Sequence, residues 1–249
     1  MALTDEMHSG RRKPIPVRNT STGIARVTFS LDDLVPMVFD SSKASLAFSL
    51  ARRYRLHGAL DEVALQRAFS TVIARHEALR TRFVLDGHRV LQRIDDPPDE
   101  FPINVLDVSS FDKKDPEQDI ELLLQTSSRK PFDLSREHPL RIFLYQCGPD
   151  EYVLHLIVHH LLFDGRSMQL LWKEVAACYE AYCQQLESPL KPPRLQFADF
   201  SEWQRDWTYS SEARPSVDYW ISKLQGSSEG STFHATKPAL LSNGQLERW

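Results

Sequence analysis

Residues 152–165, YVLHLIVHHLLFDG, decide the fold prediction because they read as a strand that ends in a turn. The first eight of these residues are apolar on both faces of an extended chain, apart from His155 and His159. Strands buried on both faces have this pattern, whereas strands with one face in water alternate polar and apolar residues. The pattern therefore predicts a strand over 152–159 inside a sheet that is covered on both sides.

An amphipathic helix is expected after the turn at Asp164-Gly165. Its apolar side chains recur at spacings of three and four: Met168, Leu171, Trp172, Val175, Tyr179, Tyr182 and Leu186. Such a stripe packs against a core. We predict a helix over 170–186 that lies on the 152–159 strand and stops before Pro189.

The preceding and following segments complete an alternation of helices and strands. Helical spacing runs from Leu65 to Leu79, with Asp61 as the expected N-cap, and Asp86-Gly87 is expected to turn a hairpin over 83–94. The remaining predictions are a helix over 117–127, a strand over 140–147 and a largely helical segment over 197–220. This order predicts the α/β class, with a mixed β-sheet flanked by helices.

The 249 residues suffice for one to two domains. Residues 1–26 are polar and lack periodicity, so we predict a flexible leader there, followed by one folded unit over 27–226. A polar tail rich in serine and glycine follows at 227–249, and we interpret it as a linker.

Charge and cysteine content narrow the partners. The formal net charge is -4, so nothing overall draws the chain to nucleic acid or to an anionic membrane. No signal peptide and no apolar run of transmembrane length is present. The three cysteines, Cys147, Cys178 and Cys183, have no paired spacing and indicate free thiols in a reducing compartment. We therefore expect a cytoplasmic protein without disulfides or structural zinc.

The candidate site lies where the buried strand ends, at His159-His160. Alternation along a strand puts the two imidazoles on opposite faces, so they cannot have the same role. One interpretation makes both of them core histidines. A metal site that uses His155, His159, His160 or Asp164 is a second interpretation, but adjacent strand residues point apart and no metal is expected. The third is a catalytic histidine with a structural aspartate, because a histidine held in one tautomer can act as a base near neutral pH.

The stretch HHLLFDG at 159–165 resembles the HHxxxDG signature of condensation domains of nonribosomal peptide synthetases, members of the chloramphenicol-acetyltransferase-like superfamily. Three further stretches follow that family's order: RHEALRTRF at 75–83, PFDLSREHPLRIFLYQ at 131–146 and FADFSEWQRDW at 197–207. The resemblance covers about residues 50–226 and implies a chloramphenicol-acetyltransferase-like α/β sandwich subdomain.

The resemblance also implies a chemistry. Condensation domains form an amide between two substrates carried as thioesters on the phosphopantetheine of peptidyl or acyl carrier proteins, without metal or bound cofactor. It assigns catalysis to His160 and structural roles at the site to His159, Asp164 and Gly165. We expect Gly165 to permit a tight turn. For Asp164 we expect a buried ion pair, with Arg80 as its candidate partner or, alternatively, as a solvated arginine at a helix end.

Two departures from the family pattern matter. Residues 28–50 lack the family's tryptophan and glutamine, and a complete condensation domain is about twice this long. We therefore interpret the chain as an N-terminal condensation subdomain, truncated or split, with 227–249 leading toward a C-terminal subdomain that could also act in trans. The alternatives are a noncatalytic module that binds a carrier protein or another protein chain, and a standalone acyltransferase that uses acyl-CoA.

Overall fold

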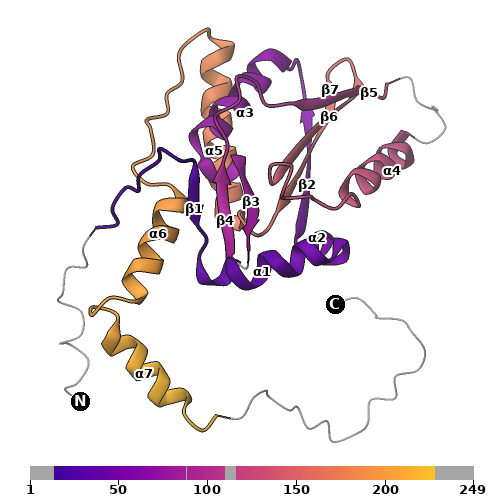
Figure 1. The fold of residues 1–249 in the computed structure, drawn as a ribbon. Helices are drawn as coiled ribbons and strands as arrows, with labels where there is room; N and C mark the ends of the chain where they lie inside the picture. The colour runs from indigo at the N-terminus through magenta and orange to yellow at the C-terminus, as the bar shows by residue number, and fades with distance from the viewer. Residues whose placement is uncertain (1–13, 88, 110–115, 228–249) are drawn as a thin grey trace, which may run out of the picture. The chain divides into compact units, whose positions relative to one another are not determined.

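The structure is a computed structural model that describes residues 14–87, 89–109 and 116–227 (Figure 1). It divides into two compact units, residues 1–207 and 208–249. The single folded unit expected over 27–226 extends across this division. The second unit contains α7 (Arg214–Leu224), and none of the side chains of this helix is buried.

A four-stranded sheet forms the centre of the first unit. Its strand order is β2 (Ser49–His57), β7 (Glu151–His159), β6 (Leu140–Gly148) and β5 (Ile103–Asp107). The β2–β7 and β7–β6 pairs are antiparallel and the β5–β6 pair is parallel, so the sheet is mixed as predicted. The predicted strand over 152–159 is confirmed, since β7 lies between β2 and β6 and is buried along residues 152–159.

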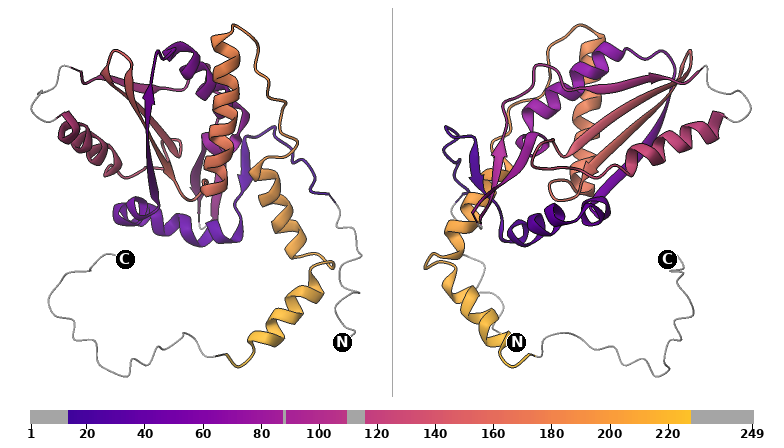
Figure 2. Two further views of the ribbon diagram at one scale, coloured as in Figure 1. Left: turned by 180° about the vertical axis from the view of Figure 1, so that it is seen from behind. Right: turned by 45° about the vertical axis from the view of Figure 1, so that its right-hand side comes forward.

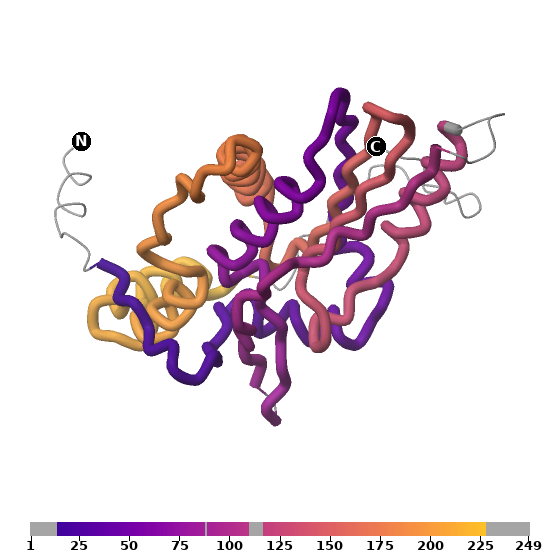
Figure 3. The backbone as a smooth tube through the Cα atoms, turned by 90° about the horizontal axis from the view of Figure 1, so that it is seen from above, coloured from indigo at the N-terminus to yellow at the C-terminus, as the bar shows by residue number. Residues whose placement is uncertain are grey.

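Helices α3 (Glu62–Arg75) and α5 (Gly165–Cys183) cover one face of this sheet (Figure 3). Phe69 from α3 and Leu171 from α5 share a core with Leu156 of β7, which confirms the predicted packing of the long helix. The Asp61 carboxylate caps α3 by accepting a hydrogen bond from the Ala64 amide at 2.9 Å. Local sequence patterns thus place both helices correctly.

The opposite face is covered by α4 (Pro116–Ser128), and α1 (Phe29–Asp40) and α2 (Ser42–Ala47) lie at one end (Figure 2). Ile157 of β7 packs with side chains of α1, and Val153 packs with side chains of α4. Predictions based on the sequence included α4 but missed α1, α2, β2 and β5.

A second, three-stranded sheet has the order β1 (Ile24–Arg26), β4 (Arg89–Ile94) and β3 (Thr81–Asp86). The predicted hairpin is confirmed as β3 and β4, which pair in antiparallel register. Gly87 has a φ of 61°, the left-handed conformation that made Asp86-Gly87 a turn prediction.

The expectation of a flexible leader is wrong for residues 14–26. Besides the strand β1, this segment carries Arg18, whose guanidinium lies 3.0 Å from Asp199 and 2.7 Å from Glu77. Only 6% of the Arg18 side chain is exposed. Both partners are distant in sequence, so no local pattern reveals these ion pairs. Residues 1–13 of the expected leader and 228–249 of the expected linker lie outside the described residues.

In the described part of the chain, no helix is both long enough and apolar enough to cross a bilayer. The predicted helical segment over 197–220 corresponds to α6 (Phe197–Thr208) and most of α7. Of these two helices, α6 matters for the site, because it lies beside α1 and β1 in the first unit (Figure 1).

Candidate active site

His160 lies one residue beyond the end of β7 and is exposed. Its backbone amide donates to the Phe48 carbonyl at 2.7 Å, and its imidazole Nδ1 lies 2.7 Å from the Phe163 carbonyl oxygen. A carbonyl oxygen only accepts, so Nδ1 must carry the hydrogen. In the neutral imidazole, Nε2 then holds a lone pair, and no described residue bonds to it. This arrangement leaves Nε2 able to accept a proton.

His160 lines a surface groove of about 360 Å³. The groove lies among the first turns of α1, the residue between α2 and β2, the residues after β7, and α6. Its other lining residues are Thr28, Ser30, Leu31, Leu34, Phe48, Leu161, Phe197, Phe200 and Gln204. His160 therefore borders a hollow in which a small molecule could be held.

His159 has a different environment, as the alternation predicted. Its side chain is fully buried, stacked at 6.1 Å from Phe48 and edge-on at 5.6 Å to Phe132. Its Nδ1 accepts a hydrogen bond from the Leu161 amide at 3.4 Å. Burial lowers the pKa of His159 to about 4, and the charges of His160 and Arg141 add to the shift. His159 is thus a neutral core histidine at physiological pH.

Asp164 is exposed and caps α5, so the expected buried ion pair with Arg80 is wrong. One carboxylate oxygen accepts from both the backbone amide and the hydroxyl of Ser167 at 2.7 Å. These two bonds hold the pKa of Asp164 below its usual range. A carboxylate that caps an exposed helix start remains hydrated and needs no arginine.

Arg80 is 9% exposed, so the alternative of a solvated arginine is wrong as well. Its guanidinium donates to the Asp95 carbonyl and lies 3.9 Å from the Glu77 carboxylate. Burial lowers its pKa from the usual value. Arg80 therefore supports the turn between α3 and β3.

Gly165 does not need to be glycine for the turn, contrary to the expectation. Its φ is not positive, and a Cβ built there would meet nothing within 4 Å. Gly165 is the first residue of α5, and a side chain there would begin in open space.

The cap predicts a modest stability effect at Asp164. We expect Asp164→Ala to lower the free energy of unfolding by about 1 kcal/mol, the usual value of a lost N-cap, and Asp164→Asn to lower it less. Urea denaturation of the three proteins measures both changes. A loss of about 3 kcal/mol or more for Asp164→Ala would instead indicate a buried ion pair.

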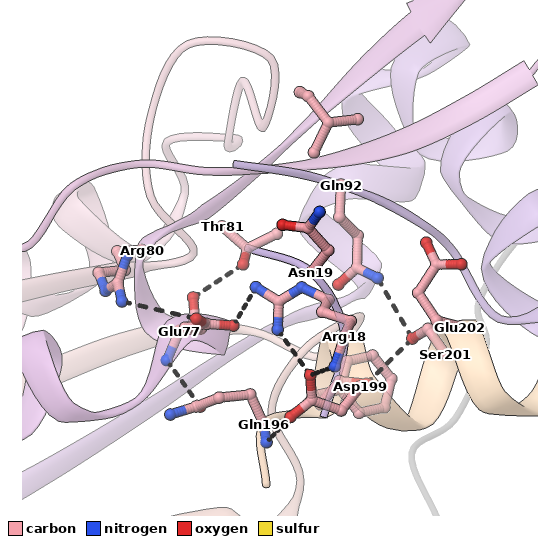
Figure 4. A network of polar contacts seen from close by, with 12 residues as sticks. Arg18, Asn19, Glu77, Arg80, Thr81, Gln92, Gln196, Asp199, Ser201 and Glu202 are labelled. Atoms are coloured by element: carbon pink, nitrogen blue, oxygen red, sulfur yellow. Dashed lines mark hydrogen bonds and ion pairs between the residues drawn. The ribbon is translucent and has the colours of Figure 1, made fainter. Parts of the chain in front are cut away.

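Two of the quoted motifs meet in one polar network (Figure 4). Asp199 of α6 accepts hydrogen bonds from the Arg18 guanidinium at 3.0 Å and from the Arg18 backbone amide at 3.1 Å. It also accepts one from the backbone amide of Gln196 at 2.8 Å. The side chain of Gln196 accepts a hydrogen bond from the Glu77 backbone amide and donates one to the Arg75 carbonyl. The network holds α6 against residues 75–80 and so fixes the wall of the groove that α6 contributes. Arg18 and Gln196 were missed by sequence reasoning, because neither lies in a recognisable motif.

Among the described residues, no group of three or more histidine, cysteine or acidic side chains is arranged to hold a metal ion. His159 is enclosed by aromatic rings, whereas His160 lies at the groove, so the two imidazoles do not converge.

Comparison with protein families gives a match to the Condensation domain model over residues 38–240. A linear gramicidin synthase of Brevibacillus parabrevis is 35% identical over 173 residues, and the match covers 70% of this chain and 3% of that protein. Chondramide synthase cmdD of Chondromyces crocatus is 36% identical over 181 residues, covering 73% of this chain and 5% of that protein.

Solved structures share the fold of this chain. The X-domain in a complex of the X-domain and OxyB from teicoplanin biosynthesis matches with a TM-score of 0.74 at 27% identity, over 90% of this chain and 48% of that one. The starter condensation domain of rhizomide synthetase RzmA matches in fold, with a TM-score of 0.70 at 19% identity, over 83% of this chain and 49% of that one. The chain thus spans about half the length of these solved chains and a small part of the synthetases.

Proposed function

Because this chain belongs to the condensation-domain family, we propose that it takes part in amide-bond formation between two carrier-bound substrates in nonribosomal peptide biosynthesis. The observation that carries the proposal is the geometry of His160. Its Nδ1 donates to the Phe163 carbonyl, which leaves Nε2 as the proton acceptor, and His160 lines the groove.

The proposed step needs no bound cofactor. The acceptor amine attacks the carbonyl carbon of the donor thioester, and the new C–N bond gives a tetrahedral intermediate. His160 Nε2 accepts the proton that the amine loses. The C–S bond then breaks, and the departing thiolate takes up this proton from His160 Nε2, which gives the free pantetheine thiol and returns His160 to its neutral form. Phosphopantetheine is here part of the substrates, and its carrier proteins are the proposed partners.

Both substrates must be held in position and shielded from water, and His160 and its groove provide too little surface to do this for two substrates. The solved relatives are about twice as long as this chain. We propose that a second condensation subdomain, in cis or in trans, completes the site.

The test is an assay with both substrates loaded on carrier proteins and with the second subdomain supplied. We expect a carrier-bound amide product, detected by mass spectrometry, that is absent when the acceptor carrier is omitted. Carrier binding without amide formation would overturn the proposal in favour of a noncatalytic interaction module. Equal turnover of a free acyl-CoA donor would overturn it in favour of a standalone acyltransferase.

A further inference from the structure

We propose that the groove beside His160 binds an uncharged, apolar side chain or acyl group of a pantetheine-linked substrate. The inference rests on the proposed function, because it takes the groove to be part of the same reaction site. It adds the class of substrate.

The lining of the groove supports this class. Six of its residues are apolar: Leu31, Leu34, Phe48, Leu161, Phe197 and Phe200. The polar ones besides His160 are Thr28, Ser30 and Gln204, which are uncharged. Ligand sites commonly combine apolar walls with a few polar groups that fix orientation. Aspartate, glutamate, lysine and arginine are absent from this lining, so among its described residues only His160 can carry a charge.

Other hollows of similar size on the first unit have a different character. Three of them, with volumes of about 300, 480 and 370 Å³, each contain both arginine and carboxylate side chains in their lining. Their chemistry is that of ordinary charged surface. The groove at His160 is therefore distinguished from them by the lack of such charges, since one of the three hollows is also lined by a histidine, His155.

The groove also has fixed walls, which a selective site requires. Arg205 of α6 donates to the Val27 carbonyl at 2.7 Å, pairs with Asp32 of α1, and lies 4.1 Å over the ring of Phe29. These contacts clamp α6 to the start of α1, the two helices that flank the groove. A ligand side chain would enter a hollow whose width is set before binding.

Burial of a charged group in such a groove is unfavourable. A carboxylate or ammonium that loses water without gaining a partner costs several kcal/mol. A tenfold change in affinity corresponds to about 1.4 kcal/mol. We therefore expect the chain to discriminate by at least about tenfold between an apolar and a charged group of similar size.

The experiment measures binding of stable pantetheine amides to the full 249-residue chain by calorimetry or ligand-observed NMR. The probes are leucyl-, aspartyl- and lysyl-pantetheine amide, with and without an N-acetyl group. We expect leucyl to bind at least about tenfold more tightly than aspartyl or lysyl. The free-amine probes mimic an acceptor and the acetylated ones a donor, so the tighter series identifies which substrate occupies the groove.

Ser30 allows a sharper test, since it is an exposed groove residue that can be changed without disturbing the core. We expect Ser30→Arg to raise affinity for aspartyl probes and Ser30→Asp to raise affinity for lysyl probes, with leucyl binding weakened in both. Met37→Arg is the matched control, because Met37 is 44% exposed on the same helix and lies outside the groove lining. It should leave the order of affinities unchanged.

Equal affinity for the leucyl, aspartyl and lysyl probes, or no response to either Ser30 substitution, would overturn the inference. Selective leucyl binding by a protein that forms no amide with carrier-bound substrates would retain the inference and reject the proposed function. Amide formation with equal use of charged and apolar substrates would support the proposed function and reject the inference about the groove.

Discussion

His160→Ala is expected to lower the rate of amide formation by about 10²–10⁴, the range typical of a lost general acid–base group. The melting temperature should stay close to that of the unchanged protein, because His160 is exposed and its side chain bonds, within the described part of the chain, to the Phe163 carbonyl alone. Single-turnover assays with both carrier-bound substrates and the second subdomain, run beside thermal melts, measure the two effects.

His57→Ala is the control, because His57 is an exposed histidine at the other end of β2, away from the groove. We expect it to change neither rate nor melting temperature. If His160→Ala keeps a near-normal rate, or loses rate only in proportion to a lowered melting temperature, His160 is not catalytic.

Asp199→Ala is expected to give the largest loss of stability, about 3–5 kcal/mol. Removal of this carboxylate leaves the Arg18 guanidinium buried with Glu77 as its remaining acidic partner, and it removes an acceptor from the Gln196 amide. Urea denaturation monitored by tryptophan fluorescence measures the change.

Asp206→Ala is the matched control on the same helix. Asp206 pairs with Arg26 at 2.6 Å, but its side chain is 74% exposed, so we expect a loss below about 1 kcal/mol. If Asp199→Ala fails to fold, Asp199→Asn is measured instead, since it keeps an acceptor oxygen for Arg18 and for the Gln196 backbone amide, and we expect its loss to exceed that of Asp206→Ala. Equal losses of unfolding free energy for the Asp199 and Asp206 variants would contradict the role of Asp199 in the buried polar network.

Sequence patterns predicted those helices and strands whose characteristic pattern lies within a short stretch of sequence. The buried strand β7, the helices α3, α4 and α5, and the β3–β4 hairpin each carry their periodicity or turn dipeptide within a short stretch. By contrast, β2 has the sequence SLARRYRLH and is mostly not buried, so its arginines hide the strand pattern. Its place is set by pairing with β7, a contact between residues about 100 positions apart.

At the site, too, the sequence predicted only what is encoded locally. The HHxxxDG-like motif at the end of the predicted strand indicated His160, and the alternation of side chains along a strand predicted that His159 lies in a different environment. The tautomer did not follow from the sequence, because it depends on a turn that brings the Phe163 carbonyl to Nδ1. Asp164 was assigned to a buried ion pair, although an aspartate just before a helix is the ordinary signal of an N-cap, which the structure shows it to be.

The central claim is that the reactive nitrogen is Nε2 of His160. Long-range ¹H–¹⁵N correlation spectra of the ¹⁵N-labelled protein above neutral pH, with His160→Ala to assign the signal, observe the nitrogens directly and need no substrate. The structure predicts that His160 has a protonated Nδ1 and an Nε2 with the shift of an unprotonated ring nitrogen, and that the buried His159 stays neutral through pH 5–8. A hydrogen on Nε2 with a bare Nδ1 at His160, or a titration of His159 in that range, would contradict it.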